Sequence, residues 1–483
     1  MGPRLVPSAL AFACLAVLSV LTLSGSPAFA QEPTSVDGLD VVQRSRYATI
    51  YALPGEGKRR AVISVQAQNY QRADGSWAPI VEELAAADQS SGMDFDCLEN
   101  GLQSQFGRVN GLPMVRVNTI GNAPVSMVPA GMVARRADGS VIEQTAPNAT
   151  VATRVGLRTV EYRNLYPGAI DQYIAVAERV KHSLVLDAAA LQLPAGTAWI
   201  GGTYRFTLPA GYALQTASGD AISGSTVVER GLQIVDADGN AVYQILPVWV
   251  YDASGASIEG RYSVTVNDDA TIDITMEADA AWATDPARVL PIEIDPTLTA
   301  QPDPAAGKDA YIRQAAPASN YGNDQHLGAN YGVPNQWLIC WVQYDVSPIP
   351  SDSTVDAARY EWYHWGNTAT NETLSAHLVT AGWTETGVTW NNQPAYDNNN
   401  LTTLTYPAGQ NAWRVWNTNL VSTTQGWVDG SIPNNGLMIR NDSQQQFFIY
   451  HYGSDYTANV ALRPKYIVDY TENLGPMITS PAA

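Results

Sequence analysis

The stretch Thr271-Ile272-Asp273-Ile274-Thr275-Met276 alternates polar and apolar side chains from one residue to the next. A period of two sends one set of side chains into a core and the other into water, which is the pattern of a half-buried β-strand. Residues 204–208 and 262–266 alternate in the same way. These runs predict that this part of the chain forms sheets.

Short turn signals lie between runs of this kind. They pair a residue that tolerates positive φ with glycine, as tight hairpin turns require, and they are Asp74-Gly75, Asp138-Gly139, Asp238-Gly239 and Ser254-Gly255. The sequence after residue 30 shows no amphipathic helical pattern. Short strands with frequent turns predict an all-β, multidomain chain of β-sandwiches.

The first thirty residues have the order of a signal peptide. Arg4 precedes an apolar run over residues 10–23, and the small-x-small site Ala28-Phe29-Ala30 precedes Gln31. A retained membrane anchor is the weaker alternative, because the run is barely long enough to span and no basic cluster follows it. A lipoprotein anchor at Cys14 fits poorly. We therefore expect a secreted or cell-surface protein that is not inserted in the membrane after cleavage.

Composition narrows the range of partners. The chain carries 46 acidic against 27 basic residues, a net charge of −19, and charged residues make up 15% of it. An acidic chain does not bind nucleic acid or anionic membranes through general electrostatic attraction. Two cysteines, Cys97 and Cys340, remain after cleavage, so burial rather than disulfide bonding must stabilise the core. Whether these two cysteines pair stays open.

Changes in composition predict the domain boundaries. Residues 295–307 are rich in proline and alanine, which indicates a linker near residue 300, and a softer division falls near residue 155. The expected parts are a signal peptide (1–30), an N-terminal β domain (31–155), a second β domain (156–300), a C-terminal sandwich (301–470) and a linker or the start of a further module (471–483). The last of these resembles the opening strand of an immunoglobulin-like module, so we expect the natural chain to continue.

Two phrases in the second of these β domains carry a resemblance. The phrase Tyr-x-Asn-x-Tyr-Pro-Gly-x-x-Asp runs from Tyr162 to Asp171, and Pro291-Ile292-Glu293-Ile294-Asp295-Pro296-Thr297 closes the region. Together they resemble the β-rich leader of large secreted bacterial repeat and wall-associated proteins. The resemblance implies a module that precedes other modules and has no catalytic role.

The C-terminal third carries a more specific resemblance, because seven phrases occur in order over about 165 residues. Among them are Asp309-Ala310-Tyr311-Ile312, Asn320-Tyr321-Gly322, Trp383-Thr384-Glu385 and Arg463-Pro464-x-Tyr466. The series resembles the DNRLRE domain, which is related to carbohydrate-binding module family 96. The resemblance implies a jelly-roll-like β-sandwich that binds a polysaccharide or a cell-wall glycan. Residues 301–475 hold 7 basic against 15 acidic residues, so we expect a neutral or weakly charged ligand.

Aromatic residues suggest where such a ligand binds. Nine of the thirteen tryptophans lie in residues 301–475. We expect the two members of each of the pairs Trp337/Trp341 and Trp362/Trp365 to share a face of a strand, with one pair buried and the other on a surface. Rings stack on the apolar faces of sugars, and neighbouring amides bond hydroxyl groups. The predicted ligand-binding residues are Trp337, Trp341, Tyr321, Tyr331 and Asn335, although a core role is open for each tryptophan.

Catalytic motifs are absent from the sequence. It contains neither His-Glu-x-x-His nor Gly-x-Ser-x-Gly, and Glu385 is better explained by the family's fold signature than as a glycosidase acid. We expect no enzymatic activity and no catalytic residue. Asp309 and Asn320 are candidate ligands for calcium, although Asp309 capping a turn is an equal alternative. Three function classes remain: a binding module, a structural or adhesive surface-assembly protein, and a polysaccharide-degrading enzyme.

Overall fold

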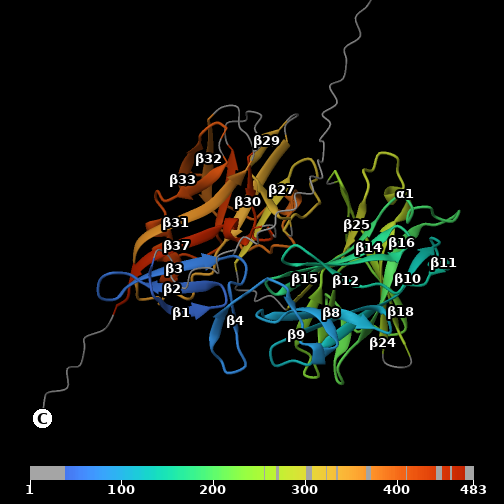
Figure 1. Cartoon of the computed structure of the whole chain (residues 1–483). Coiled ribbons are helices and arrows are strands. Elements are labelled where there is room, and N and C mark those ends of the chain that lie inside the picture. Colours follow the sequence, from blue (N-terminus) through green and yellow to red (C-terminus); the bar gives the residue numbers. More distant parts are fainter. Residues whose placement is uncertain are drawn as a thin grey trace, which may run out of the picture.

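The computed structural model describes residues 38–473, apart from 255, 268–270, 301–306, 323, 333–335, 366–370, 410, 442–448 and 457–458. The predicted signal peptide, and residues 474–483 of the predicted final segment, lie outside the described residues. Strands make up most of the regular structure of the described chain, with two short α-helices, α1 (Ala280–Ala283) and α2 (Val421–Val428). Figure 1 shows two bodies side by side. The prediction of an all-β fold is confirmed.

The first sandwich packs a ten-stranded sheet against an eleven-stranded sheet. The ten-stranded sheet contains, in spatial order, β18 (Ser225–Val228), β23 (Arg261–Val266), β24 (Thr271–Asp279), β16 (Trp199–Thr207), β10 (Val125–Arg135), β9 (Leu112–Thr119), β8 (Leu102–Val109), β7 (Met93–Cys97) and β6 (Ala85–Ala86), with β11 (Val141–Thr145) beside β10. The eleven-stranded sheet contains β12 (Ala152–Val155), β13 (Thr159–Tyr166), β14 (Ala169–Val176), β15 (Arg179–Leu186), β26 (Leu298–Ala300), β20 (Ala241–Ile245), β19 (Leu232–Val235) and β17 (Ala213–Thr216), with β25 (Ile292–Asp295), β21 (Trp249–Asp252) and β22 (Ser257–Glu259) branching from β15. One apolar cluster, which includes Ile274 and Leu184, lies between the two sheets.

The second sandwich packs an eight-stranded sheet against a six-stranded sheet. The eight-stranded sheet contains β1 (Val41–Ser45), β2 (Ala48–Ala52), β3 (Lys58–Ser64), β37 (Lys465–Thr471), β31 (Thr354–Trp365), β36 (Tyr450–Tyr452) and β28 (His326–Gly328), with β34 (Ala412–Trp416) beside β31. The six-stranded sheet contains β27 (Lys308–Arg313), β30 (Gln336–Gln343), β35 (Leu437–Asn441), β32 (Glu372–Leu378) and β33 (Thr402–Tyr406), with β29 (Asn330–Gly332) beside β30. A separate hairpin, β4 (Asn69–Gln71) with β5 (Trp77–Pro79), follows β3.

Strand pairing in both sandwiches crosses the domain boundaries expected from the sequence. In the second sandwich the first strands of the chain join the last, because β3 pairs with β37 from Lys58 opposite Thr471 to Ser64 opposite Lys465. Figure 1 shows β1, β2 and β3 against β37 and β31. In the first sandwich β10 pairs with β16, across the boundary expected near residue 155. Residues on both sides of each boundary therefore complete the same sheets.

The Tyr-Pro-Gly phrase between β13 and β14 has a structural explanation. Gly168 adopts a positive φ of 72°, and a Cβ there would lie 2.2 Å from the Asp187 carboxylate, so the turn requires glycine. The turn leads into β14, where the fully buried Asp171 accepts hydrogen bonds from the hydroxyls of Tyr173 (2.8 Å) and Tyr204 (2.7 Å). The phrase thus builds a buried polar centre in the first sandwich.

The two cysteines lie in different sandwiches. Cys97 and Cys340 are both free and buried, so the question of their pairing is answered: they form no disulfide. Burial raises the pKa of the Cys97 thiol to about 12, which keeps it protonated. Within the described residues, no helix is both long and apolar enough to cross a membrane.

Candidate functional site

Strand β31 sends alternate side chains to opposite faces of its sheet. Trp362 and His364 point into the core and are fully buried, whereas Tyr363 and Trp365 point outward and are partly exposed. The alternation follows from the period of two in a strand. An exposed face of the second sandwich thus carries large rings.

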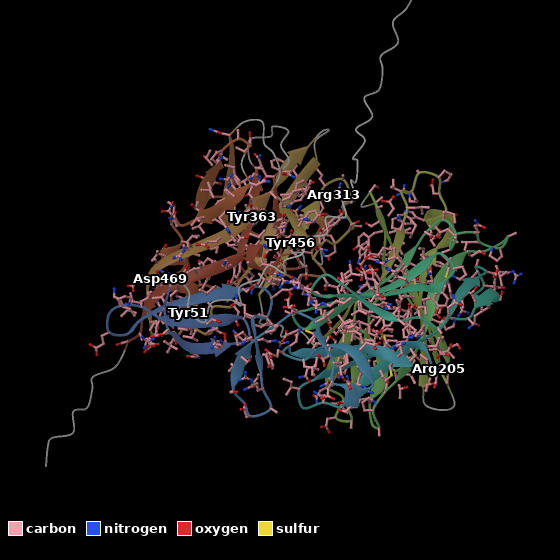
Figure 2. The ribbon with its side chains drawn as sticks, viewed as in Figure 1. Tyr51, Arg205, Arg313, Tyr363, Tyr456 and Asp469 are labelled. Atoms are coloured by element: carbon pink, nitrogen blue, oxygen red, sulfur yellow. The ribbon has the colours of Figure 1, made fainter. Side chains whose placement is uncertain are left out.

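The outward rings of neighbouring strands continue this surface, which we call the aromatic row. The ring of Tyr363 lies 5.7 Å from that of Trp413, edge to face, and 5.7 Å from that of Tyr452, stacked. Trp365 stacks on Tyr450 at 5.5 Å between ring centroids. The members of the aromatic row are all partly exposed, and they are Trp413, Tyr363, Trp365, Tyr450, Tyr452, Tyr456 and His326. Figure 2 labels Tyr363 and Tyr456 on this sandwich, with Tyr456 nearer the first sandwich.

The sheet holds the row in a fixed geometry. Tyr363 is the direct cross-strand partner of Trp413, and Trp365 is that of Tyr450. Cross-strand rings in such positions restrict one another's rotamers. The row is therefore formed before any ligand arrives, which reduces the entropic cost of binding.

A buried layer beneath the row anchors the same strands. The rings of Trp362 and His451 stack 3.4 Å apart, and the Trp362 indole donates a hydrogen bond of 2.6 Å to the Tyr406 hydroxyl. The imidazole of His451 also lies within hydrogen-bonding distance of that hydroxyl, at 3.0 Å. Burial, together with the nearby His364, lowers the pKa of His451 well below its ordinary value, so this imidazole is uncharged. The buried guanidinium of Arg414 supplies a positive charge to the layer, 5.1 Å from the centre of the Tyr406 ring.

Two tyrosines of the row have raised pKa values and are uncharged at neutral pH. Partial burial, together with the hydrogen bond to Tyr456, raises the pKa of Tyr452 to about 12, and burial raises the pKa of Tyr450. A cation marks one end of the row, where the Lys465 ammonium lies 5.0 Å from the centre of the Trp413 ring. A preformed row of aromatic rings can stack on the apolar faces of a string of sugars.

The structure places the two tryptophans expected to bind ligand on the opposite sheet. Trp341 is fully buried, in a cluster with Ile312 and Trp383 on the outer face of the six-stranded sheet, and Trp337 packs against the same cluster while partly exposed. The two tryptophans do share a face, as their spacing of four residues requires. Trp341 offers no exposed ring, because the segment with Trp383 and Val388 covers it.

The remaining expected ligand-binding residues are not brought together on a described surface. Tyr321 is partly exposed and stacks on Tyr311 at 4.5 Å. The backbone of Tyr331 belongs to β29, and its side chain lies outside the described part, as does the whole of Asn335. A ligand-binding role for Trp337, Tyr321, Tyr331 and Asn335 stays a prediction.

The two expected calcium ligands are engaged in internal hydrogen bonds. Asp309 is buried, and both its carboxylate oxygens accept bonds from Ser454, one from the backbone amide (2.8 Å) and one from the hydroxyl (2.7 Å). The Asn320 side chain donates to the carbonyl oxygens of Glu385 and Val388, each at 2.7 Å. The described residues contain no group of three or more His, Cys, Asp or Glu side chains that could hold a metal ion. Both side chains thus link distant segments of the chain, and a calcium-binding role for them stays a prediction.

Sequence reasoning missed the aromatic row because of one error of spacing. Trp362 and Trp365 were expected to share a face, but they are three positions apart, and an odd spacing places strand residues on opposite faces. Trp362 is accordingly buried and Trp365 is partly exposed. Correct counting would have pointed to Tyr363 and Trp365, although not to their neighbours on β34 and β36.

Comparisons with known proteins give relatives for parts of the chain. The chain is 22% identical over 291 residues to the tRNA(Glu)-specific nuclease WapA of Bacillus subtilis subsp. natto and to the tRNA nuclease WapA of Bacillus subtilis strain 168. These alignments cover 54% of this chain and 11% of each relative, so the chain spans about a tenth of the curated proteins it matches.

A solved structure and a family model complete the comparison. A Paenibacillus xanthan lyase has 9% identity and a TM-score of 0.10, over 90% of this chain and 39% of that one. Similarity at that level supports no argument about fold or function. The stretch that holds the six-stranded sheet and the whole aromatic row, residues 301–468, matches the model of Carbohydrate-binding module family 96.

Proposed function

We propose that this chain is an exported, non-catalytic protein that binds a polysaccharide along the aromatic row of its second sandwich. The observation that carries the proposal is the row itself, in which Tyr363, Trp365, Trp413 and Tyr452 present partly exposed rings, in contact with one another, on one sheet face. Partly exposed tryptophans gathered on one face are typical of a surface that binds a ligand. The match of this region to a carbohydrate-binding module supports the same class of ligand.

The expected ligand is neutral or weakly charged. The rings supply dispersion and C–H contacts rather than charge, and residues 301–475 carry 15 acidic against 7 basic residues. A strongly anionic chain would be repelled by this excess of negative charge. Binding through stacked rings should accordingly depend little on salt concentration.

A catalytic role for Glu385 has little support. Its Oε1 accepts a hydrogen bond from the backbone amide of Asp309, and its Oε2 lies 3.7 Å from the Arg179 guanidinium. Both oxygens therefore face internal partners, whereas a glycosidase acid must reach a sugar oxygen.

The test is isothermal titration of the full chain with soluble fragments of cellulose, xylan, mannan and chitin. We expect millimolar to micromolar affinity for at least one of them, with little change between low and high salt. Replacing Tyr363 and Trp365 together by alanine should weaken binding by about ten- to hundredfold, because two stacking rings are lost. The near-ultraviolet circular dichroism of each variant would establish that it is folded.

Trp337→Ala serves as the matched variant on the other sheet, where sequence reasoning had placed the ligand. If Trp337→Ala abolishes binding and the double variant does not, the location proposed here is wrong. If no fragment binds, the proposed ligand class is wrong. If binding disappears with added salt, the mechanism through neutral rings is wrong.

A further inference from the structure

The two sandwiches contact each other through a cluster of charged side chains. Arg179 begins β15 of the first sandwich, and its guanidinium forms an ion pair with Asp455 (2.5 Å) and lies 3.7 Å from the Glu385 carboxylate, both in the second sandwich. Gln66, which follows β3, donates to the same Asp455 oxygen. We call Arg179, Asp455, Glu385 and Asp309 the junction cluster.

Hydrogen bonds connect the three carboxylates of the junction cluster. Glu385 accepts a bond from the backbone amide of Asp309 at 3.1 Å, and Asp309 in turn accepts two bonds from Ser454, which precedes Asp455. Asp309 and Asp455 are buried, and the side chain of Glu385 is 18% exposed. The three acidic groups therefore share one small, poorly solvated space.

Negative charge exceeds positive charge in that space. Arg179 is the cation of the cluster; it contacts Asp455 and Glu385 directly and acts on Asp309 through its charge. The other charged groups around it have partners of their own. Two of these pairs, Arg46 with Glu178 and Arg463 with Glu82, also join the second sandwich to the first or to the segment that leads into it. Lys181 pairs with Glu293 and Asp295, Lys308 donates to the Trp383 carbonyl, and Asp324 accepts from the Tyr311 hydroxyl. Three ionised carboxylates on one guanidinium would be strongly unfavourable in a buried site.

The cluster can relieve that repulsion by holding protons. Burial, partly offset by Arg179 and reinforced by the charge of Asp455, raises the pKa of Glu385 to about 8. Burial and the charge of Asp455 raise the pKa of Asp309 to about 7. Protonation of such a carboxyl keeps its hydrogen bonds while removing one negative charge.

We propose that the junction cluster is a proton-dependent latch, in which Arg179 reinforces the contact between the two sandwiches while a carboxyl of the cluster is protonated. As the pH rises, the cluster loses protons, and repulsion between Asp309, Asp455 and Glu385 weakens the junction.

The direction of the effect follows from proton linkage. An acid whose pKa is higher in the folded protein than in the unfolded chain binds more protons when folded, over the range between the two values. Stability is then fully present below the ordinary pKa of the carboxyl and is lost as the pH rises through about 7 to 8. The latch is therefore closed in mildly acidic solution and weakened in mildly alkaline solution.

The experiment measures small-angle X-ray scattering and thermal unfolding of the full chain between pH 5.5 and 8.5. For the unmodified protein we expect a larger radius of gyration at pH 8.5 and a melting temperature lower by roughly 2–4 °C or more. Glu385→Gln keeps the acceptor for the Asp309 amide but cannot ionise, so it should keep the compact form at pH 8.5 and flatten the pH dependence. Arg179→Met should give the larger radius at both pH values.

Arg205→Met is the matched control, because Arg205 forms a two-bond pair with Asp273 on an exposed face of the first sandwich (Figure 2). It should show the same pH dependence as the unmodified protein. If Arg179→Met fails to fold, Arg179→Lys is the second variant. It keeps the positive charge but loses the planar guanidinium that reaches both Asp455 and Glu385, so it should show a partial increase in the radius of gyration. An unchanged pH dependence in Glu385→Gln, or a radius that does not vary with pH in the unmodified protein, would overturn the proposal.

Discussion

The first sandwich directs tyrosine rings inward and gives their hydroxyls partners in the core. Tyr162 donates to the Gly107 carbonyl, while Tyr173 and Tyr204 donate to the buried Asp171. In the second sandwich β31 carries rings on both faces, with Trp362 in the core and Tyr363 outside. Aromatic residues are abundant in both sandwiches, and the aromatic row lies on the second.

This difference shows that aromatic density is a poor guide to binding. Trp341 and Trp413 are both tryptophans of the second sandwich, yet the first is fully buried and the second is partly exposed beside Lys465. Both lie on the outer face of their own sheet, so what separates them is whether a loop covers that face. Each of the following predictions tests this division between rings that stabilise the fold and rings that are free to contact a ligand.

The largest effect should come from isolating the second sandwich as residues 301–475. Without β3, the edge of β37 loses its partner, and the core loses the buried Ala61 and Ile63. We expect this fragment to be insoluble or to lack a cooperative unfolding transition, because an uncovered apolar edge favours aggregation. A fragment in which residues 38–66 are fused ahead of residue 301 should regain the transition. Cooperative melting of residues 301–475 alone would contradict the prediction.

The next effect compares two tryptophans in the full chain. Trp341→Ala removes a fully buried ring and should lower the free energy of unfolding by about 3–5 kcal/mol. Trp413→Ala removes a partly exposed ring and should cost about 1 kcal/mol. Urea denaturation followed by circular dichroism measures both values. Equal losses in the two variants would mean that the aromatic row is also a structural element.

The third comparison concerns the free energy of unfolding that single hydroxyls contribute in the first sandwich, which should be smaller than the contribution of the buried Trp341 ring. Tyr204→Phe removes a hydrogen bond to the buried Asp171 carboxylate and should cost about 1.5–3 kcal/mol. Tyr243→Phe removes a bond that Tyr243 accepts from the Thr119 amide, a neutral partner, and should cost about 0.5–1.5 kcal/mol. The same denaturation measurement separates the two. A Tyr204→Phe variant as stable as the unmodified chain would show that Asp171 does not depend on this bond.

Local patterns predicted the strands well, because alternation is a property of neighbouring residues. The run 271–276 lies in β24, with Ile272, Ile274 and Met276 buried. Pairing between distant strands leaves no such local trace. The pairing of β3 with β37 joins two segments from opposite ends of the chain. The sequence therefore offered no sign that residues 41–64 complete a sheet near the C-terminus.

The candidate site was only partly accessible from the sequence. The motifs of the C-terminal third indicated the right class of module, and the match over residues 301–468 agrees with that indication. The choice of face failed for Trp341, because the loop that carries Trp383 and Val388 covers it through contacts between residues distant in sequence. The junction cluster was equally hidden, since Arg179 and Asp455 are separated by 276 positions.

The joining of the first and last strands also constrains the order in which this protein can fold. Arg60 and Asp469, which form an ion pair across β3 and β37, are 409 positions apart, so β1 to β3 must wait until almost the whole chain has been synthesised. The strands of the first sandwich lie between them in the chain and can assemble earlier. Once the first sandwich has folded, the chain between β3 and β37 is compact instead of being a long flexible loop. This lowers the entropic cost of bringing β3 and β37 together. The first sandwich would thus act as an internal scaffold for the final assembly step of the second.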